Sequence, residues 1–200
     1  MAANGRVITG FSKPYIAVYA NNGSTVTYSD GMVLARGVSV SLAPESSDDN
    51  NFYADNVVAE SAGGIFTGGT ATLTVDGLNP AARKLAMGLP TAGSDGWTPI
   101  GDNAAPPYLG IGYIVRYMSG GDVIYVPTVL AKTKMSIPTE DAATQEDQIA
   151  WQTTPLEFNL MRDDSANHNW RFIGADCTTE AAAEAALQTK LGISSNASTT

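Results

Sequence analysis

The stretch GIFTGGTATLTVDGLNPAARKLAMG, residues 64–88, decides the fold because it combines the signals of a strand, a turn and a helix. Apolar and polar side chains alternate along it, with Ile65, Ala71, Leu73 and Val75 on one face and Thr70, Thr72, Thr74 and Asp76 on the other. Successive strand side chains point to opposite faces, so this alternation predicts a strand with one buried and one solvated side.

A short helix is predicted to follow this strand directly. Asn79 supplies an N-cap oxygen, and Pro80 takes the first helical position, where its missing N–H costs nothing. Residues 81–87 are mostly good helix formers, and Gly88 can adopt the left-handed conformation that ends a helix. The side chains expected to face a sheet are those of Leu78, Ala81 and Leu85. We therefore expect this helix to close one end of a β-structure.

The composition limits the classes of function that the chain can serve. Its 200 residues make one large domain or two small ones, and a hydrophobic content of 44% is enough for a packed core. Charged residues make up only 16%, below the usual quarter, which suits surfaces that meet other subunits. A net charge of −9 argues against tight nucleic-acid binding, which needs Lys and Arg to replace phosphate counterions.

Strand patterns recur along the rest of the chain and come in adjacent pairs rather than in alternation with helices. The predicted strands are residues 15–20, 25–28, 32–42, 57–60, 108–118, 123–135, 148–161 and 170–173, and Pro155 interrupts 148–161, which is therefore one strand or two. A second helix, residues 180–191, is predicted from the cap residue Thr179 and from the apolar stripe formed by Ala183, Leu187 and Leu191. The pattern indicates a mainly β fold, an antiparallel β-sandwich or open barrel with one flanking α-helix and a C-terminal helix.

The expected domain organisation is simple. Residues 1–192 are predicted to form a single β domain, and residues 193–200 a flexible tail. Residues 39–60 are predicted to form a long two-stranded arm, whose polar tip is the acidic, aperiodic stretch 44–51. Residues 89–107 form a long loop without periodicity, and loops of this length usually have a function or are disordered.

The chain offers little for catalysis or cofactor binding. His168 is the only histidine and Cys177 the only cysteine, so neither a His-dependent nucleophile nor a zinc site with its about three or four ligands is expected. Asp48 and Asp49 leave calcium binding open as the lesser alternative to a solvated loop. We therefore expect no catalytic residues, no cofactor and no metal.

The sequence also predicts a compartment. Its start shows no basic region followed by an apolar one, and no apolar run approaches the about 18 residues of a membrane span. These features predict an intracellular product without a membrane anchor.

Several stretches resemble one family. The succession LARGVSVSLAPESSDDNNFYADN, GIFTGGTATLTVDGLNPAARKLAMG, YLGIGYIVR, VPTVLAKTKMSIPTEDAATQEDQI and TPLEFNLM is similar to the major tail proteins, or tail-tube proteins, of long non-contractile-tailed bacteriophages. The similarity covers residues 32–192, and its more specific parts are YADN at 53–56 and the GGTATLTV strand at 68–75.

This resemblance implies a function in the virion. Hexameric rings would stack into the tail tube, the conduit for genome delivery, after assembly in the bacterial host cytoplasm. It implies that the arm reaches the neighbouring ring, and the contact residues expected there are Glu45, Asp48, Asp49, Phe52, Tyr53, Asp55 and Asn56. It also implies tape-measure and tail-terminator proteins as partners. DNA would pass through without specific binding, which an acidic lumen would favour.

Other functions stay open at the level of the sequence. A carbohydrate-binding β-sandwich module would need an exposed aromatic platform, for which Trp97, Trp151 and Trp170 are scattered candidates. A hydrolase would need two carboxylates about 5 to 10 Å apart in a cleft. A tube subunit of a contractile tail or of a secretion system would share the same general fold.

Overall fold

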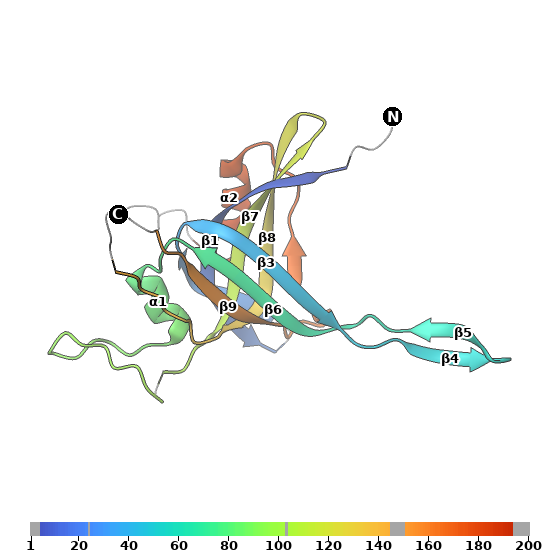
Figure 1. Cartoon of the computed structure of the whole chain (residues 1–200), viewed down its shortest axis with the longest axis horizontal. Helices are drawn as coiled ribbons and strands as arrows, with labels where there is room; N and C mark the ends of the chain where they lie inside the picture. Colours follow the sequence, from blue (N-terminus) through green and yellow to red (C-terminus); the bar gives the residue numbers. More distant parts are fainter. Residues whose placement is uncertain (1–4, 24, 103, 145–150, 194–200) are drawn as a thin grey trace.

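The computed structural model of the chain describes residues 5–23, 25–102, 104–144 and 151–193, which form ten strands and two helices (Figure 1). Residues 194–200 of the predicted flexible tail 193–200 and the start of the predicted strand 148–161 lie outside the described residues. The prediction of a flexible tail was wrong at Ile193, which is buried against the residues that α2 covers. The strands are β1 (Val7–Asn22), β2 (Thr25–Val33), β3 (Gly37–Ser46), β4 (Asn50–Ala54), β5 (Val57–Ala62), β6 (Phe66–Val75), β7 (Tyr108–Ser119), β8 (Asp122–Met135), β9 (Thr154–Met161) and β10 (Arg171–Ile173). The helices are α1 (Pro80–Met87) and α2 (Glu180–Lys190).

One antiparallel sheet contains all the strands except β4 and β5. Its order is β2-β1-β7-β8-β9-β6-β3, with β10 pairing beside β8. The path ends on β2 at one side and on β3 at the other, so within the described residues these two strands leave an edge unpaired. The predicted fold, an antiparallel β-sandwich or open barrel with two helices, is confirmed.

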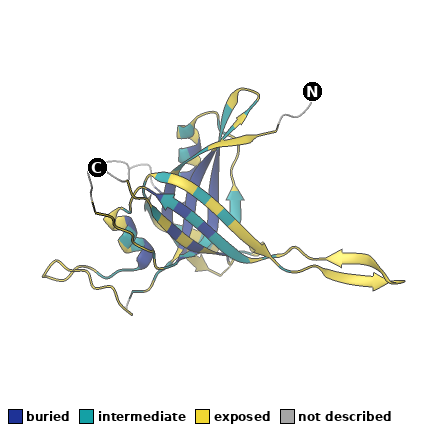
Figure 2. Ribbon diagram, viewed as in Figure 1, coloured by how far each residue is buried: buried dark blue, intermediate teal, exposed yellow. Residues whose placement is uncertain are grey.

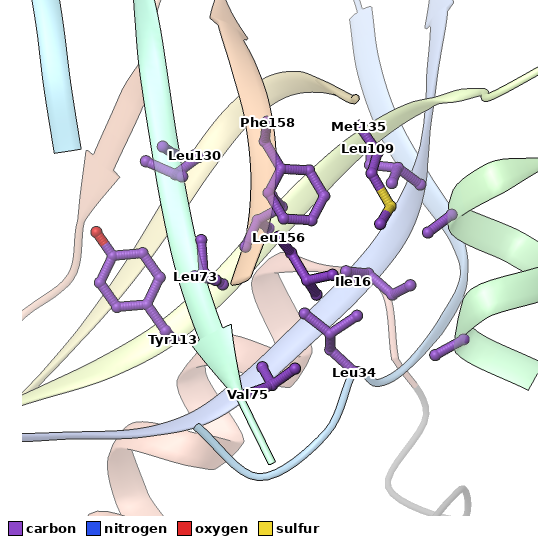
Figure 3. Close-up of a cluster of buried hydrophobic side chains, with 14 of the residues drawn as sticks. Ile16, Leu34, Leu73, Val75, Leu109, Tyr113, Leu130, Met135, Leu156 and Phe158 are labelled. Atoms are coloured by element: carbon purple, nitrogen blue, oxygen red, sulfur yellow. The ribbon is translucent and has the colours of Figure 1, made fainter. Parts of the chain in front are cut away.

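The core lies between two layers of this curled sheet. β3, β6 and β9 pass across β1, β7 and β8, and α2 lies on the far side of the second layer (Figure 1). Side chains from both layers meet in the interior (Figure 3), and the fully buried ones include Ile16, Leu73, Leu109, Tyr113, Leu130, Leu156 and Phe158. Burial of this apolar surface is the main term that stabilises the domain.

β6 shows the alternation that the sequence predicts. Ala71, Leu73 and Val75 have no exposed surface, while the threonines between them are only half-buried because they lie on the outer side of the layer. The prediction was wrong at Ile65, which is 62% exposed. Ile65 precedes the first residue of β6 and lies in the connection to the β4–β5 hairpin, where the sandwich does not cover it.

The caps of α1 are those predicted, but its buried face is different. The Asn79 side chain accepts a hydrogen bond from the backbone N–H of Ala81 at 2.9 Å, and Gly88 ends the helix at φ 60°. Ala82 and Ala86, one helical turn apart, are fully buried and Met87 is nearly so, whereas Ala81 is exposed. Leu78 and Leu85 are half-buried around this contact. The small alanines let the helix approach the core more closely than a leucine-lined face would.

α2 and its apolar stripe are confirmed. The Thr179 hydroxyl accepts from the N–H of Ala182, and Ala183, Leu187 and Leu191 are buried. They pack on the outer side chains of β1, β7 and β8, which are Tyr15, Ala17, Ile114 and Val129. Gly112 on β7 makes this approach possible, because a Cβ there would lie 2.7 Å from the Cδ1 atoms of Leu187 and Leu191.

The predicted strand 32–42 was wrong as a single element. β2 ends at Val33 and β3 begins at Gly37, and the chain turns between them with Leu34 fully buried. The N–H of Leu34 donates to the carbonyl of Pro14, so the turn is fixed to β1. The apolar residues around Leu34 therefore form a buried turn and not a continuous strand.

Truncating a central side chain of the core to alanine should destabilise the domain more than truncating an exposed one. Leu73→Ala should lower the free energy of unfolding by about 2–5 kcal/mol, and Phe158→Ala by about 3–5 kcal/mol, because each leaves a cavity between the two layers. Urea unfolding followed by circular dichroism measures both. Val38→Ala is the control, since Val38 is 54% exposed and should change stability by less than about 1 kcal/mol. Equal losses in all three variants would contradict the placement of the core.

Buried tyrosines predict a loss of stability in alkali. Burial raises the pKa of Tyr113 to about 12, and burial together with a hydrogen bond to Glu184 raises the pKa of Tyr15 to about 12. Because these pKa values lie above the ordinary value of 10.0, stability is full below pH 10 and falls as the pH rises toward 12. Urea unfolding at increasing pH measures the slope. Tyr113→Phe removes one ionisable group and should flatten it, whereas an unchanged slope would count against this origin.

Candidate assembly surfaces

The β4–β5 hairpin, Asn50–Ala62, is called the arm here because it projects from the body of the domain (Figure 1). Every residue of its two strands is exposed (Figure 2). Its turn consists of Asp55 and Asn56 at φ 51° and 63°, both in the left-handed region that the tightest hairpins require and that Asp and Asn tolerate. The arm is therefore a hairpin, with one shift of register between Phe52 and Tyr53, that the rest of the described chain leaves exposed.

The arm starts later in the sequence than predicted. Residues 39–46 of the predicted arm 39–60 belong to β3, which pairs with β6 from Gly37 to Ser46. The stretch 44–51 is not the tip, because it contains the end of β3 and the start of β4. Pro44 pairs with Gly69, whose φ of 143° and missing side chain leave room for Ala43 and Pro44. The polar composition of 44–51 does not reveal the pairing of β3 with β6, because the other edge of β3 faces solvent.

The structure places the predicted contact residues along one exposed segment rather than in one cluster. Glu45 lies on β3, and Asp48 and Asp49 lie in the connection to the arm. Phe52 and Tyr53 lie on β4, and Asp55 and Asn56 form the turn. At the base of the arm, the N–H of Ser47 donates to the carbonyl of Ile65, and the N–H of Ile65 donates to the Ser47 hydroxyl. These bonds hold the two connections side by side.

Apolar side chains occupy both faces of the arm. Phe52 and Tyr53 are 65% and 62% exposed, and two residues that the sequence reading missed, Val57 and Val58, are 63% and 51% exposed. Ala54 is opposite Val57, and Tyr53 is opposite Val58, so each face carries one aromatic ring and one valine. An isolated two-stranded hairpin is only marginally stable in water.

The arm is also acidic. No Lys or Arg occurs between Arg36 and Arg83, and the segment from β3 to the end of β5 carries the carboxylates of Glu45, Asp48, Asp49, Asp55 and Glu60. A surface that binds this segment must therefore be neutral or positively charged.

The unpaired outer edges of β2 and β3 are the second candidate surface. A strand at the end of a sheet presents backbone N–H and C=O groups that can pair with another chain. Both ends of the eight-stranded sheet have this property among the described residues. The edges could therefore pair with a strand of another chain.

The residues that the sequence offers for catalysis or ligand binding take part in turns, strand bridges and ring stacking. His168 is exposed at φ 50°, and its Nδ1 lies 3.3 Å from the carbonyl oxygen of Asp163. The buried Asp163 carboxylate accepts from the N–H groups of Ser165 and Asn169, which fixes this turn. Cys177 is half-buried and pairs with Tyr125 through an isolated backbone bridge. Trp170 stacks on Phe66 with ring centroids 4.8 Å apart, so its face is already used.

Within the described residues, no three His, Cys, Asp or Glu side chains come together as a metal site, and no helix there is long and apolar enough to cross a membrane. No protein-family model matches the chain, and no curated protein is significantly similar to it. The exposed arm and the unpaired strand edges are therefore the features of the described structure that bear on function.

The arm should exchange its amide hydrogens faster than the body of the sheet. Its backbone bonds are solvent-exposed and no core covers them, so local opening costs little free energy. Hydrogen exchange followed by mass spectrometry on dilute protein should show low protection at 50–62 and high protection at 66–75. Equal protection of the two segments would contradict a free-standing arm.

Proposed function

We propose that this chain is a structural virion protein that polymerises as stacked hexameric rings into the tail tube of a long non-contractile-tailed bacteriophage. The observation that carries the proposal is the arm, on which Phe52 and Tyr53 stay 65% and 62% exposed. The hexameric ring and the phage tail come from the sequence resemblance. The arm and the open sheet edges support self-assembly in general.

Burial energetics favour a partner for the arm. Covering an aromatic or aliphatic side chain contributes about 1.5–3 kcal/mol, and the arm has four such side chains on a hairpin that its own chain does not cover. The partner proposed is another copy of the chain. A copy in the next ring would cover the arm and add to its stability at the same time.

The unpaired edges support ring formation. β2 and β3 are opposite ends of one sheet, so pairing the β2 edge of one copy with the β3 edge of the next is a head-to-tail contact. Such contacts close into rings when the rotation between copies allows it. This arrangement makes β-strand pairing the contact within a ring and the arm the contact between rings.

The proposal includes location and partners. The tube would belong to the virion, with subunits assembled in the bacterial host cytoplasm, and its ends would meet tape-measure and tail-terminator proteins, as the resemblance implies. The net charge of −9 would keep the lumen from binding DNA, because like charges repel phosphate. A tube of a contractile tail or of a secretion system would use the same geometry, and the presence of a sheath distinguishes it.

Replacing the arm tests the proposal. A variant in which a short Gly-Ser turn replaces residues 50–62, joining Asp49 to Gly63, keeps the pairing of β3 with β6 and removes the exposed side chains. We expect wild-type protein at high concentration to form hollow tubes in negative-stain electron microscopy, and the arm-less variant to form none.

The control is the fold of the variant, which circular dichroism and thermal unfolding should show to be retained. Wild-type protein that stays a monomer and binds a glycan array would overturn the proposal. In that case the carbohydrate-binding alternative, for which Trp97 and Trp151 are 77% and 86% exposed, would take its place. Tubes of normal length from the arm-less variant would remove the arm from the mechanism.

A further inference from the structure

A groove of about 420 Å³ opens between the two layers of the sheet, beside the unpaired edge of β3. The side chains that shape it include Phe11 on β1, Val38, Val40 and Leu42 on β3, Tyr117 on β7 and Arg171 on β10. Its walls are mainly apolar. It exists because the sheet curls without closing, so β3 does not pair with β1 or β7.

The rim of the groove is open to solvent. Val38 on β3 is 54% exposed and Ile8 on β1 is 65% exposed, while Val40 and Leu42 are half-buried further in. Phe11 packs closely on Gly37, because a Cβ atom on Gly37 would lie 2.2 Å from the ring of Phe11. The groove therefore has a fixed floor and an apolar mouth that a partner could cover.

Arg171 gives the groove a positive charge. In the pairing of β10 with β8, Arg171 is opposite Leu130, which is fully buried between the layers, so Arg171 lies on the same inward side of the sheet. Its Nε is buried and has no hydrogen-bond partner among the described residues. The residues that line the groove in the described part of the chain include no carboxylate. A buried donor without a partner is unfavourable, so an incoming acceptor would be stabilised there.

The arm and the groove complement each other in apolar surface and in charge. The face of the arm that holds Phe52, Ala54 and Val57 is apolar next to the turn, Glu60 lies opposite Phe52, and the Asp55 carboxylate lies at the tip. The segment from β3 to β5 has carboxylates and no Lys or Arg, while the groove has a cation and no carboxylate. Apolar surface would meet apolar surface, and the acidic tip would meet Arg171.

We propose that the groove is the docking site for the arm of a second copy of this chain, with the Phe52 face on its apolar walls and Asp55 paired with Arg171. The inference rests on the proposed function in that it names the acceptor for the arm. The arm of the same chain cannot reach the groove in this fold, because it leads away from the body beyond the far end of β3 (Figure 1). The contact therefore joins different copies and can repeat from one to the next.

The test mixes two variants, each of which lacks one side of the proposed contact between arm and groove. The arm-less variant has a groove and no arm, and the groove-blocked variant Val38→Lys has an arm and an obstructed groove. Because Val38 is exposed at the rim, the lysine leaves the core intact. At a protein concentration too low for the strand edges to pair, each variant alone should sediment as a monomer, and the mixture should form a 1:1 complex of the arm with the free groove. Sedimentation velocity measures the mixture.

Point variants assign the contact. In the groove-blocked partner, Phe52→Ser should weaken the mixed complex by at least about tenfold, and its matched control on the opposite face, Tyr53→Ser, by less than about threefold. Asp55→Asn and, in the arm-less partner, Arg171→Gln should each weaken it about tenfold, and the two changes together should cost little more than either alone. Thermal unfolding checks that Arg171→Gln stays folded.

The outcomes separate the two proposals. A mixture that stays monomeric, or groove variants that polymerise like the wild type, would overturn the docking site. If wild-type tubes form and only the arm-less variant loses them, the proposed function stands without this groove. If the wild type forms no tubes but the mixture forms the complex, the docking site stands and the tail-tube function fails.

Discussion

The pairing of β6 with β9 on one side and β3 on the other is the interaction on which the rest of the structure depends. It places Ala71, Leu73 and Val75 in the core, and it holds both connections of the arm at one end of the sheet. The same pairing makes β3 the last strand, so it also creates the unpaired edge. Core, arm and open edge are thus consequences of one arrangement of strands.

The sequence was sufficient where local chemistry decides the structure. Alternation over 70–75, the Asn79 and Thr179 caps and the stripe of Ala183, Leu187 and Leu191 were all predicted correctly, because each depends on near neighbours. The buried face of α1 was not, since eight residues contain too few turns to fix a stripe and the sheet decides which side is covered. The groove was beyond prediction because its residues come from strands far apart in the sequence.

The arm illustrates how a local pattern and tertiary pairing compete. The acidic stretch 44–51 looks like a loop tip, yet β3 continues into it because β6 offers Gly68 and Gly69 as partners without side chains. The true turn, Asp55 and Asn56, has the conformation that Asx residues tolerate, and this signal was present in the sequence. Long-range pairing therefore moved the base of the arm, while local chemistry set its turn.

The placement of the arm decides what kind of assembly is favourable. A side chain that a chain covers itself contributes to its own folding, whereas the exposed rings of the arm contribute only when another molecule covers them. Copies that each carry a charge of −9 repel one another at a distance, so the attraction must come from close contacts. An arm that cannot fold back on its own domain directs those contacts outward. The arm and the surface that binds it are different parts of each copy. A copy that is bound through one of them therefore still has the other free, so assembly can continue without a fixed end.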